Sequence, residues 1–450
     1  MSDNSRPSYL ADAKPTPQSA RAPWYKNTAP AYAGILLWFV FWTMLSSDNL
    51  VNGLAVPIIA VIVGALVCHF FFYLVPGLFG MKTGLPLAVV GSSIFGEKGG
   101  IVMPGLLMGI LQFGWVAVNC IGASAIAPRL GIPQWLFIVV WGAAATFIGL
   151  KGIKYVAGIS TYLPIVPLVV LLVLLGATIT HVGDFDPKIL TSPISKGACA
   201  PADNATIFMT IVGAFVAFFA TAGAAGVDFG TSSRNARDVQ LGGLVGVAGM
   251  MIFTTVIAFL AIAGAYATPD VAKQLIATKG VSGVTAVGIL DALFGEKTGS
   301  IIFIALALAA FPSACFSSLI AANSFKTMLP KINSTLSVTV GGAAAIILAI
   351  SLQSEAGAIA NVLNIIGVSF GPICGAIFVE YFLCKGQWCG PRKGFNPAGW
   401  LAWAIGFAVG ILPNFGICQI PMTPVVTFAI GAVVYLVAML AGLKTDTIQK

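Results

Sequence analysis

Charged side chains are scarce in this chain of 450 residues, and their scarcity excludes several classes of protein. Only 8% of the residues are charged, and His69 and His181 are the two histidines of the sequence. A membrane enzyme would need clustered histidine, acidic or metal-binding groups, which two separated histidines do not provide. The net charge of +8 comes from basic residues dispersed over short segments, whereas a nucleic-acid reader gathers them on one face.

Cysteine pairs of the redox or metal-binding kind are also missing from the sequence pattern. The eight cysteines include no CxxC pair, and Cys384 and Cys389, in the run CKGQWC, give only a weak metal signal. We therefore predict ordinary free thiols and no cofactor.

Long apolar runs occupy most of what remains. Hydrophobic residues make up 58% of the chain, its mean hydropathy is +0.96, and residues 161–179 read TYLPIVPLVVLLVLLGATI. Because a helix needs about 20 apolar residues to cross a bilayer, these runs predict an all-α polytopic membrane protein. About twelve spans are expected, near residues 30–54, 56–79, 101–127, 133–150, 157–179, 205–229, 242–266, 300–325, 335–353, 361–384, 398–413 and 421–443.

The distribution of loop charge predicts the orientation of the chain. With an even number of spans both termini lie on one side, and 17 of the 23 Lys and Arg residues fall on that side. Since basic residues accumulate in cytoplasmic loops, we expect both termini in the cytoplasm and the protein in the plasma (inner) membrane. Residues 1–28 are polar and rich in proline, which predicts a disordered cytoplasmic tail before a single transmembrane domain at 29–445.

Four ionisable side chains lie within the predicted spans, where a charge is costly. Asp48 either marks an unwound part of the first span or lies in the outer loop. Asp228 forms an ion pair or helix cap at the inner interface, or else takes part in proton coupling. His69 is expected to be a packing residue, and Glu380 is expected to extend toward the cytoplasmic interface.

Two spans carry residues that suit a flat aromatic ligand. Gln112 and Trp115 are three positions apart on one helix face, so that the amide can pair with the edge of a ring stacked on the indole. In the sixth span, Phe218 and Phe219 precede the small-residue run 220–226, where a helix can pack closely or break. A broken helix exposes backbone groups that bind ions and substrates in secondary transporters.

Adjacent hydroxyls in the eighth span suggest a cation site. Ser317 and Ser318 could each give an oxygen to sodium, with backbone carbonyls of a broken helix as the remaining ligands. The alternative is that both hydroxyls bond to carbonyls of their own helix, as intramembrane serines commonly do.

Three segments carry a resemblance to a known family. Residues 80–120 contain a KTGL turn, an FG-K-G loop and a Q-x-G-W motif, residues 227–238 read VDFGTSSRNARD, and residues 366–383 read IGVSFGPICGAIFVEYFL. These segments resemble the nucleobase:cation symporter-1 family of purine and cytosine permeases, and weaker similarity extends over nearly the whole chain. The resemblance implies a LeuT-type fold with inverted repeats at about 30–180 and 205–384, broken first and sixth spans, and peripheral helices at about 398–443.

The resemblance also implies a substrate site. A planar heterocycle would stack between aromatic rings of the third and sixth spans and hydrogen-bond to a glutamine of the third span. The matching positions are Trp115, Phe219 and Gln112, with backbone contacts around Ala217, Phe218 and Ala222.

The implied cation site depends on how the eighth span is matched. A gapless match puts Pro312 and Ser313 at the family's hydroxyl pair, which loses one hydroxyl and favours protons as the driving ion. A gapped match restores Ser317 and Ser318 and puts Asn323 at a ligand-contacting position. We favour the gapped match because a sodium ion needs the pair of oxygens.

These observations predict a secondary active transporter, not an enzyme, that imports a nucleobase by symport with Na+ or H+, with cytosine or a purine as the first candidates. The expected partners are the base, the cation and the lipid bilayer, with no nucleic acid and no obligate protein partner. One alternative is a carrier of the same fold for an amino acid, an amine or another heterocycle; Gln112 beside Trp115 favours the base. A channel or receptor is less favoured, because the chain has no repeated filter sequence.

Overall fold

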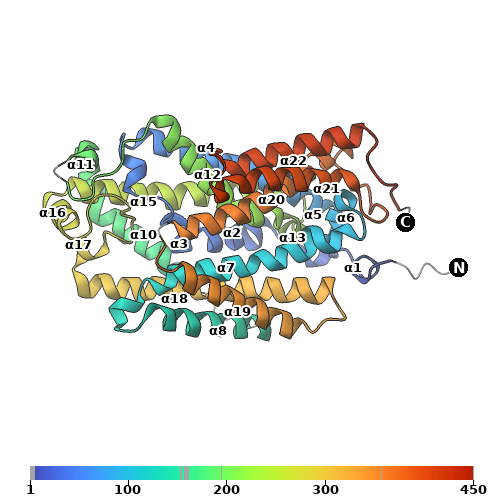
Figure 1. Cartoon of the computed structure of the whole chain (residues 1–450), viewed down its shortest axis with the longest axis horizontal. Coiled ribbons are helices and arrows are strands. Elements are labelled where there is room, and N and C mark those ends of the chain that lie inside the picture. Colours follow the sequence, from blue (N-terminus) through green and yellow to red (C-terminus); the bar gives the residue numbers. More distant parts are fainter. Residues whose placement is uncertain (1–5, 153–154, 157–161, 194, 356, 449–450) are drawn as a thin grey trace.

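The computed structural model describes residues 6–152, 155–156, 162–193, 195–355 and 357–448, and helices dominate it. Figure 1 shows an elongated bundle whose helices run broadly along its long axis, with both termini at one end. We call this the inner end and the opposite one the outer end. The outer end carries the short helices α11 (Lys188–Thr191), α16 (Pro269–Thr278) and α17 (Leu290–Phe294).

Eleven helical segments among the described residues are long and apolar enough to cross a membrane, which confirms a polytopic membrane protein. In chain order they are Ala55–Thr83 (α4, η4 and α5), Ile101–Ser124 (η5 and α7), Gln134–Lys151 (α8), Ile165–Asp184 (α10 and η7), Asn204–Ala224 (α12), Ala236–Ala267 (α14, η8 and α15), Glu296–Met328 (α18), Ser334–Leu352 (α19), Ala358–Leu383 (α20), Pro397–Phe415 (α21 and η9) and Thr423–Leu440 (α22). The most deeply buried of these segments is α20.

The first predicted span is present but broken, as the resemblance implied. It consists of α2 (Thr28–Leu36) and α3 (Phe39–Trp42), and the intervening Trp38 leaves the helical conformation at φ −57° and ψ 124°. The Trp42 indole donates a hydrogen bond of 3.1 Å to the Leu37 carbonyl, which satisfies one acceptor released by the break. Asp48 follows in η3 (Ser47–Leu50), so it lies in the outer loop and not at the break.

The sixth span is interrupted as well. Helix α12 ends at Ala224, and α13 (Gly226–Thr231) begins after Ala225, inside the predicted run of small residues. Glycine is required where α13 crosses α5 (Val75–Thr83), because a Cβ on Gly230 would overlap the carbonyl of Gly77. Within the run 220–226, a Cβ on Gly223 would likewise lie 3.0 Å from the Phe72 carbonyl oxygen, so the small residues serve both of the predicted uses, a break and a close backbone contact.

The first 28 residues, which the sequence predicts to be disordered, have a defined course from residue 6. They form α1 (Ser8–Ala11), η1 (Gln18–Ala20) and η2 (Trp24–Lys26) across the inner end. The Tyr9 hydroxyl donates to the Glu97 carbonyl at 2.6 Å, and the Arg21 guanidinium donates to the Met81 carbonyl at 2.7 Å. The prediction of disorder fails because the segment binds acceptors in distant parts of the chain, which its own composition does not reveal.

The prediction of free thiols is wrong for one pair. Cys384 and Cys389 form a disulfide, whereas the other six cysteines are free. Between them Lys385 and Gly386 have positive φ values of 51° and 71°, which turn the chain back on itself. These two successive left-handed residues bring the cysteine side chains together. The spacing of the cysteines in the sequence does not reveal such a turn.

The structure shows the surroundings of three ionisable residues predicted to lie within the spans. Glu380 is fully buried and binds Tyr435 and Arg392, so the predicted extension toward the interface is wrong. Asp228 accepts a hydrogen bond of 3.0 Å from the Leu87 amide, the first residue of α6 (Leu87–Phe95), which confirms a helix cap. His69 is buried and stacks on Tyr73, as expected of a packing residue, although its Nδ1 atom finds no hydrogen-bond partner among the described residues.

Candidate binding site between the broken spans and α7

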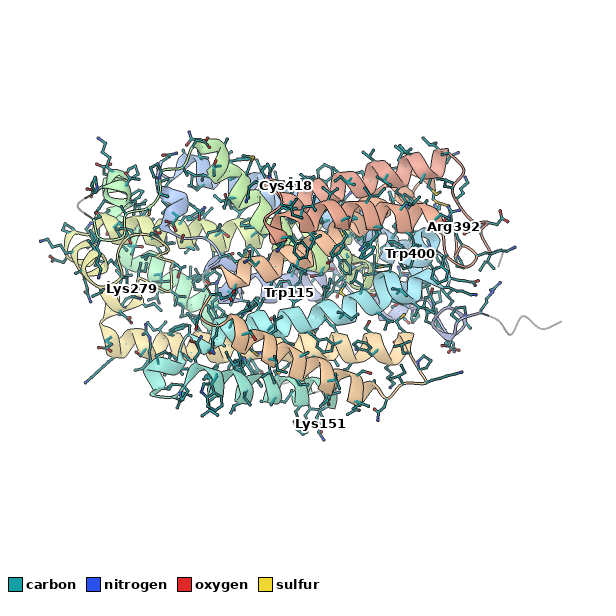
Figure 2. The ribbon with its side chains drawn as sticks, in the orientation of Figure 1. Trp115, Lys151, Lys279, Arg392, Trp400 and Cys418 are labelled. Atoms are coloured by element: carbon teal, nitrogen blue, oxygen red, sulfur yellow. A yellow bond between two sulfur atoms is a disulfide. The ribbon has the colours of Figure 1, made fainter. Side chains whose placement is uncertain are left out.

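Trp115 and Phe218 form the centre of the candidate site. Trp115 lies on α7 (Leu107–Ser124) and Phe218 on α12, and Figure 2 shows Trp115 in the middle part of the bundle. Their ring centroids are 5.0 Å apart and their planes meet at 85°. The Trp115 indole nitrogen donates to the Thr221 hydroxyl at 3.1 Å. Since Thr221 follows Phe218 by three residues, one face of α12 makes both contacts.

Trp38 adds a third ring from the break in the first span. Its ring centroid lies 6.0 Å from that of Trp115 and 6.0 Å from that of Phe218. Its indole N–H is buried and has no hydrogen-bond partner among the described residues. The ring cluster of Trp38, Trp115 and Phe218 therefore contains a buried donor for which no described residue is an acceptor.

Two amides flank Trp115 on the same face of α7. Gln112 is 5% exposed, and its nitrogen lies 3.5 Å from the Met108 sulfur, a weak acceptor. Asn119 is fully buried and donates to the Trp115 carbonyl at 2.8 Å, while its Oδ1 atom has no partner in the described part of the chain. A buried polar atom without a partner costs about 1–3 kcal/mol, so a use for this acceptor is expected.

Sequence reasoning missed Trp38 and Asn119. Asn119 follows Trp115 by four residues, so helical spacing alone puts it on the Gln112–Trp115 face. Nothing in the local sequence singles out Trp38, because the run WFVFWTML contains neither glycine nor proline. Its role depends on the break, which becomes visible only in the structure.

The structure brings together some of the predicted ligand residues and separates others. Phe219 is fully buried on the other side of α12, where its ring lies 5.7 Å from that of Tyr32. The Tyr32 hydroxyl donates to the Ala222 carbonyl at 2.7 Å, so this backbone acceptor already has a partner. Ala217 faces α20, because a Cβ on Gly367 would meet its Cα at 2.7 Å. Successive helical residues differ by about 100°, and Phe218 is therefore the one that contacts Trp115.

The predicted cation ligands on α18 do not all point the same way. The Ser318 hydroxyl donates to the Ala314 carbonyl of its own helix at 3.1 Å, and its Cβ faces Gly149 of α8. Ser317 is 7% exposed and Ser313 is half-buried. These two serines are four residues apart and so share a face of α18, whereas Ser317 and Ser318 do not. Asn323 is exposed and does not join the ring cluster.

The segment 269–295, which carries α16 and α17 at the outer end and is called the lid below, is anchored on two sides. On one side the Asp48 carboxylate accepts hydrogen bonds of 2.8 Å from the Ser282 hydroxyl and from the Gly283 amide. On the other side Arg129 binds both carboxylate oxygens of Asp291 at 2.8 Å. Burial raises the pKa of Asp48, but the hydrogen bonds outweigh it and hold this pKa below its ordinary value. The Asp48 anchor is therefore present at neutral pH and is lost as pH falls through that lowered pKa.

Apolar helices with two broken spans meeting at a buried, ring-lined centre define a secondary transporter of the LeuT type. The profile of a family described as permease for cytosine/purines, uracil, thiamine, allantoin matches residues 15–438. The chain belongs to this permease family, and it is a transporter, not an enzyme. None of the curated proteins compared with the chain matches it.

Solved structures share the fold. Mhp1, a nucleobase-cation-symport-1 family transporter, matches in a closed conformation with bromovinylhydantoin bound, at 16% identity and a TM-score of 0.64 over 95% of this chain and 94% of that one. Inward-facing Mhp1 matches at 16% identity and a TM-score of 0.67, over 97% and 95%. A Na+-coupled sialic acid symporter matches at 14% identity and a TM-score of 0.61, over 100% and 95%. These similarities establish the LeuT-type fold that the family resemblance implied.

Proposed function

We propose that the protein imports a nucleobase, cytosine or a purine first, across the plasma membrane by symport with a cation, with both termini in the cytoplasm. The observation that carries this proposal is the ring cluster of Trp38, Trp115 and Phe218, flanked by polar atoms without partners. The family description and the hydantoin in the Mhp1 structure, a planar heterocycle, support the same class of substrate.

A base would be recognised by its faces and its edge. Its flat face would stack on Trp115, and Phe218, which contacts that indole edge-to-face, would turn to cover the other side. The Trp38 N–H offers a donor, the Asn119 Oδ1 offers an acceptor, and Gln112 offers one of each. The edge of a base alternates hydrogen-bond donors and acceptors. These groups would therefore bind a base more tightly than an apolar ring of similar size.

The coupling cation would bind between α18 and the broken first span. Ser313 and Ser317 share one face of α18, and the break after α2 releases carbonyls that are not needed inside the helix. Two hydroxyls with several carbonyls form the oxygen set that suits Na+ as a hard cation. We infer sodium as the first candidate and protons as the alternative. Ser317→Ala should weaken the sodium effect, whereas Ser318→Ala should change it little because that hydroxyl bonds to its own helix.

Tryptophan fluorescence of the purified protein tests the proposal. Cytosine, adenine, guanine, hypoxanthine and uracil would be titrated with and without sodium. We expect saturable quenching by one or two bases whose affinity falls sharply in Trp115→Ala and is unchanged in Trp135→Phe, a matched control at an exposed position of α8. Quenching with wild-type affinity in Trp115→Ala would contradict the proposed site. A response to amino acids or amines but to no base would overturn the substrate class.

A further inference from the structure

The loop after α20 contains the disulfide and lies at the inner end. Cys384 directly follows the last residue of α20, and Cys389 is exposed to solvent. Both termini and most basic residues belong to the same end, which the charge distribution predicts to face the cytoplasm. Stable disulfides are rare in that reducing compartment, where those that occur are usually transient, catalytic or redox-sensing.

The loop is bound to the inner ends of α5 and α6. The Lys82 ammonium donates to the Gly386 carbonyl at 2.6 Å. The Trp388 indole donates to the Val90 carbonyl at 3.1 Å. Both contacts fall within the ring that the disulfide closes, so the bond between the sulfurs fixes the segment that holds α20 to α5 and α6.

Arg392 continues the attachment just beyond the disulfide, and Figure 2 shows it near the inner end. Its amide donates to the Ser92 carbonyl at 3.1 Å and its Nε donates to the Ser93 carbonyl at 2.7 Å. Its Nη1 atom donates to the Thr445 carbonyl at 3.1 Å, which ties the carboxy-terminal segment to the same place. The loop thus connects four inner elements: α20, α5, α6 and the chain after α22.

A metal site is the competing explanation for the two cysteines. Ligand atoms of Glu380, Cys384 and Cys389 lie within 4.8 Å of one another. The Glu380 carboxylate, however, already accepts a hydrogen bond of 2.9 Å from Tyr435 and lies 3.5 Å from Arg392. A cation there would face the buried guanidinium and would separate it from its carboxylate, which is costly. The surroundings therefore favour thiol chemistry over metal binding.

Movement of α20 would reach the candidate binding site. Ile366 of α20 packs against Gly114 of α7, next to Trp115. The Cys374 thiol of α20 lies 3.6 Å from the Ala220 carbonyl of α12, two residues after Phe218. Fixing the inner end of α20 therefore restrains both helices that carry the ring cluster.

We propose that Cys384 and Cys389 form a reversible disulfide that locks the inner end of α20 against α6 and that a cytosolic dithiol opens. A thiolate of the dithiol attacks the exposed Cys389 sulfur and releases the Cys384 thiolate. The second thiolate of the dithiol then displaces Cys389, so that the protein gains two electrons and two protons and the dithiol becomes a disulfide. Transport is slow in the oxidised protein and fast in the reduced one, a consequence that rests on the proposed function.

The first test needs no substrate. Hydrogen exchange of residues 92–98 and 392–396 is compared in detergent-solubilised protein before and after dithiothreitol, with the thiol state measured by alkylation and mass spectrometry. We expect faster exchange in both segments after reduction and unchanged exchange at 281–284, at the outer end. Cys384→Ser/Cys389→Ser should exchange like the reduced protein in either condition, and Cys199→Ser, a free buried thiol, should respond like the wild type.

Equal exchange in the two thiol states, or a dithiothreitol response that persists in the double variant, would overturn the proposal. Purified protein that holds stoichiometric zinc and no disulfide would replace it with the metal site. In proteoliposomes, we expect base uptake by the wild type to rise about fivefold or more on reduction, the lower end of typical coupling between sites. Redox-dependent exchange without uptake of any base would refute the proposed substrate while supporting the lock.

Discussion

Replacement of Asn119 by leucine tests whether this side chain contacts the bound base or only stabilises the fold. Asn119→Leu keeps the number and branching of the side-chain heavy atoms, removes the partnerless Oδ1 acceptor and removes the bond from Nδ2 to the Trp115 carbonyl. The first change gains about 1–3 kcal/mol and the second loses about 0.5–1.5 kcal/mol, so the free energy of unfolding should stay near the wild-type value or rise. A bound base would lose its partner, which should weaken the affinity about 5- to 150-fold.

Asn396→Leu is the matched control, because both ends of this equally buried amide are satisfied. Asn396 donates to the Ile94 carbonyl at 2.6 Å and accepts from the Thr445 amide at 3.1 Å. Its replacement should destabilise the protein by about 2 kcal/mol or more and leave the affinity for the base unchanged. Thermal unfolding and fluorescence titration in the same detergent measure both quantities. Asn119→Leu protein that is destabilised while its affinity is unchanged would refute the reasoning.

Four further substitutions address the rings, the cation and the lid. Phe218→Ala should weaken base binding about tenfold or more in fluorescence titrations, whereas Phe219→Ala should mainly lower the unfolding temperature; the reverse would restore Phe219 as the stacking partner. Ser317→Ala should raise the sodium concentration for half-maximal uptake about tenfold, and an unchanged value would remove this serine from the cation site. The buried Cys199 thiol lies 3.6 Å from the Val281 carbonyl, next to the residues that bind Asp48. Asp48→Asn weakens this anchor and should speed labelling of Cys199 by an impermeant maleimide about tenfold; unchanged labelling would mean that the anchor does not keep the lid closed.

The sequence predicts most of the architecture, because apolar runs of bilayer length and the alternation of loop charge are local properties. The break in the sixth span is also predicted, since the run 220–226 consists of small residues apart from one threonine. The break at Trp38 is different: its neighbours are large and apolar, and the contacts with Trp115 and Phe218 that accompany it come from distant spans.

The candidate site could be predicted in part for similar reasons. Gln112 and Trp115 follow from helical spacing within one span. The choice between Phe218 and Phe219 depends on the rotation of α12 relative to α7, which a single sequence does not specify. The disulfide depends on two left-handed residues between its cysteines, and the Glu380–Arg392 pair joins segments whose contact is a property of the whole fold.

Uptake into proteoliposomes tests the central claim most directly. Purified protein would be reconstituted, and entry of radiolabelled cytosine, adenine and hypoxanthine would be followed with an inward sodium gradient, with an inward proton gradient and with none. We predict gradient-driven accumulation of at least one base that is abolished in Trp115→Ala and kept in Trp135→Phe. Accumulation of an amino acid or an amine in place of every base, with full activity in Trp115→Ala, would contradict the account.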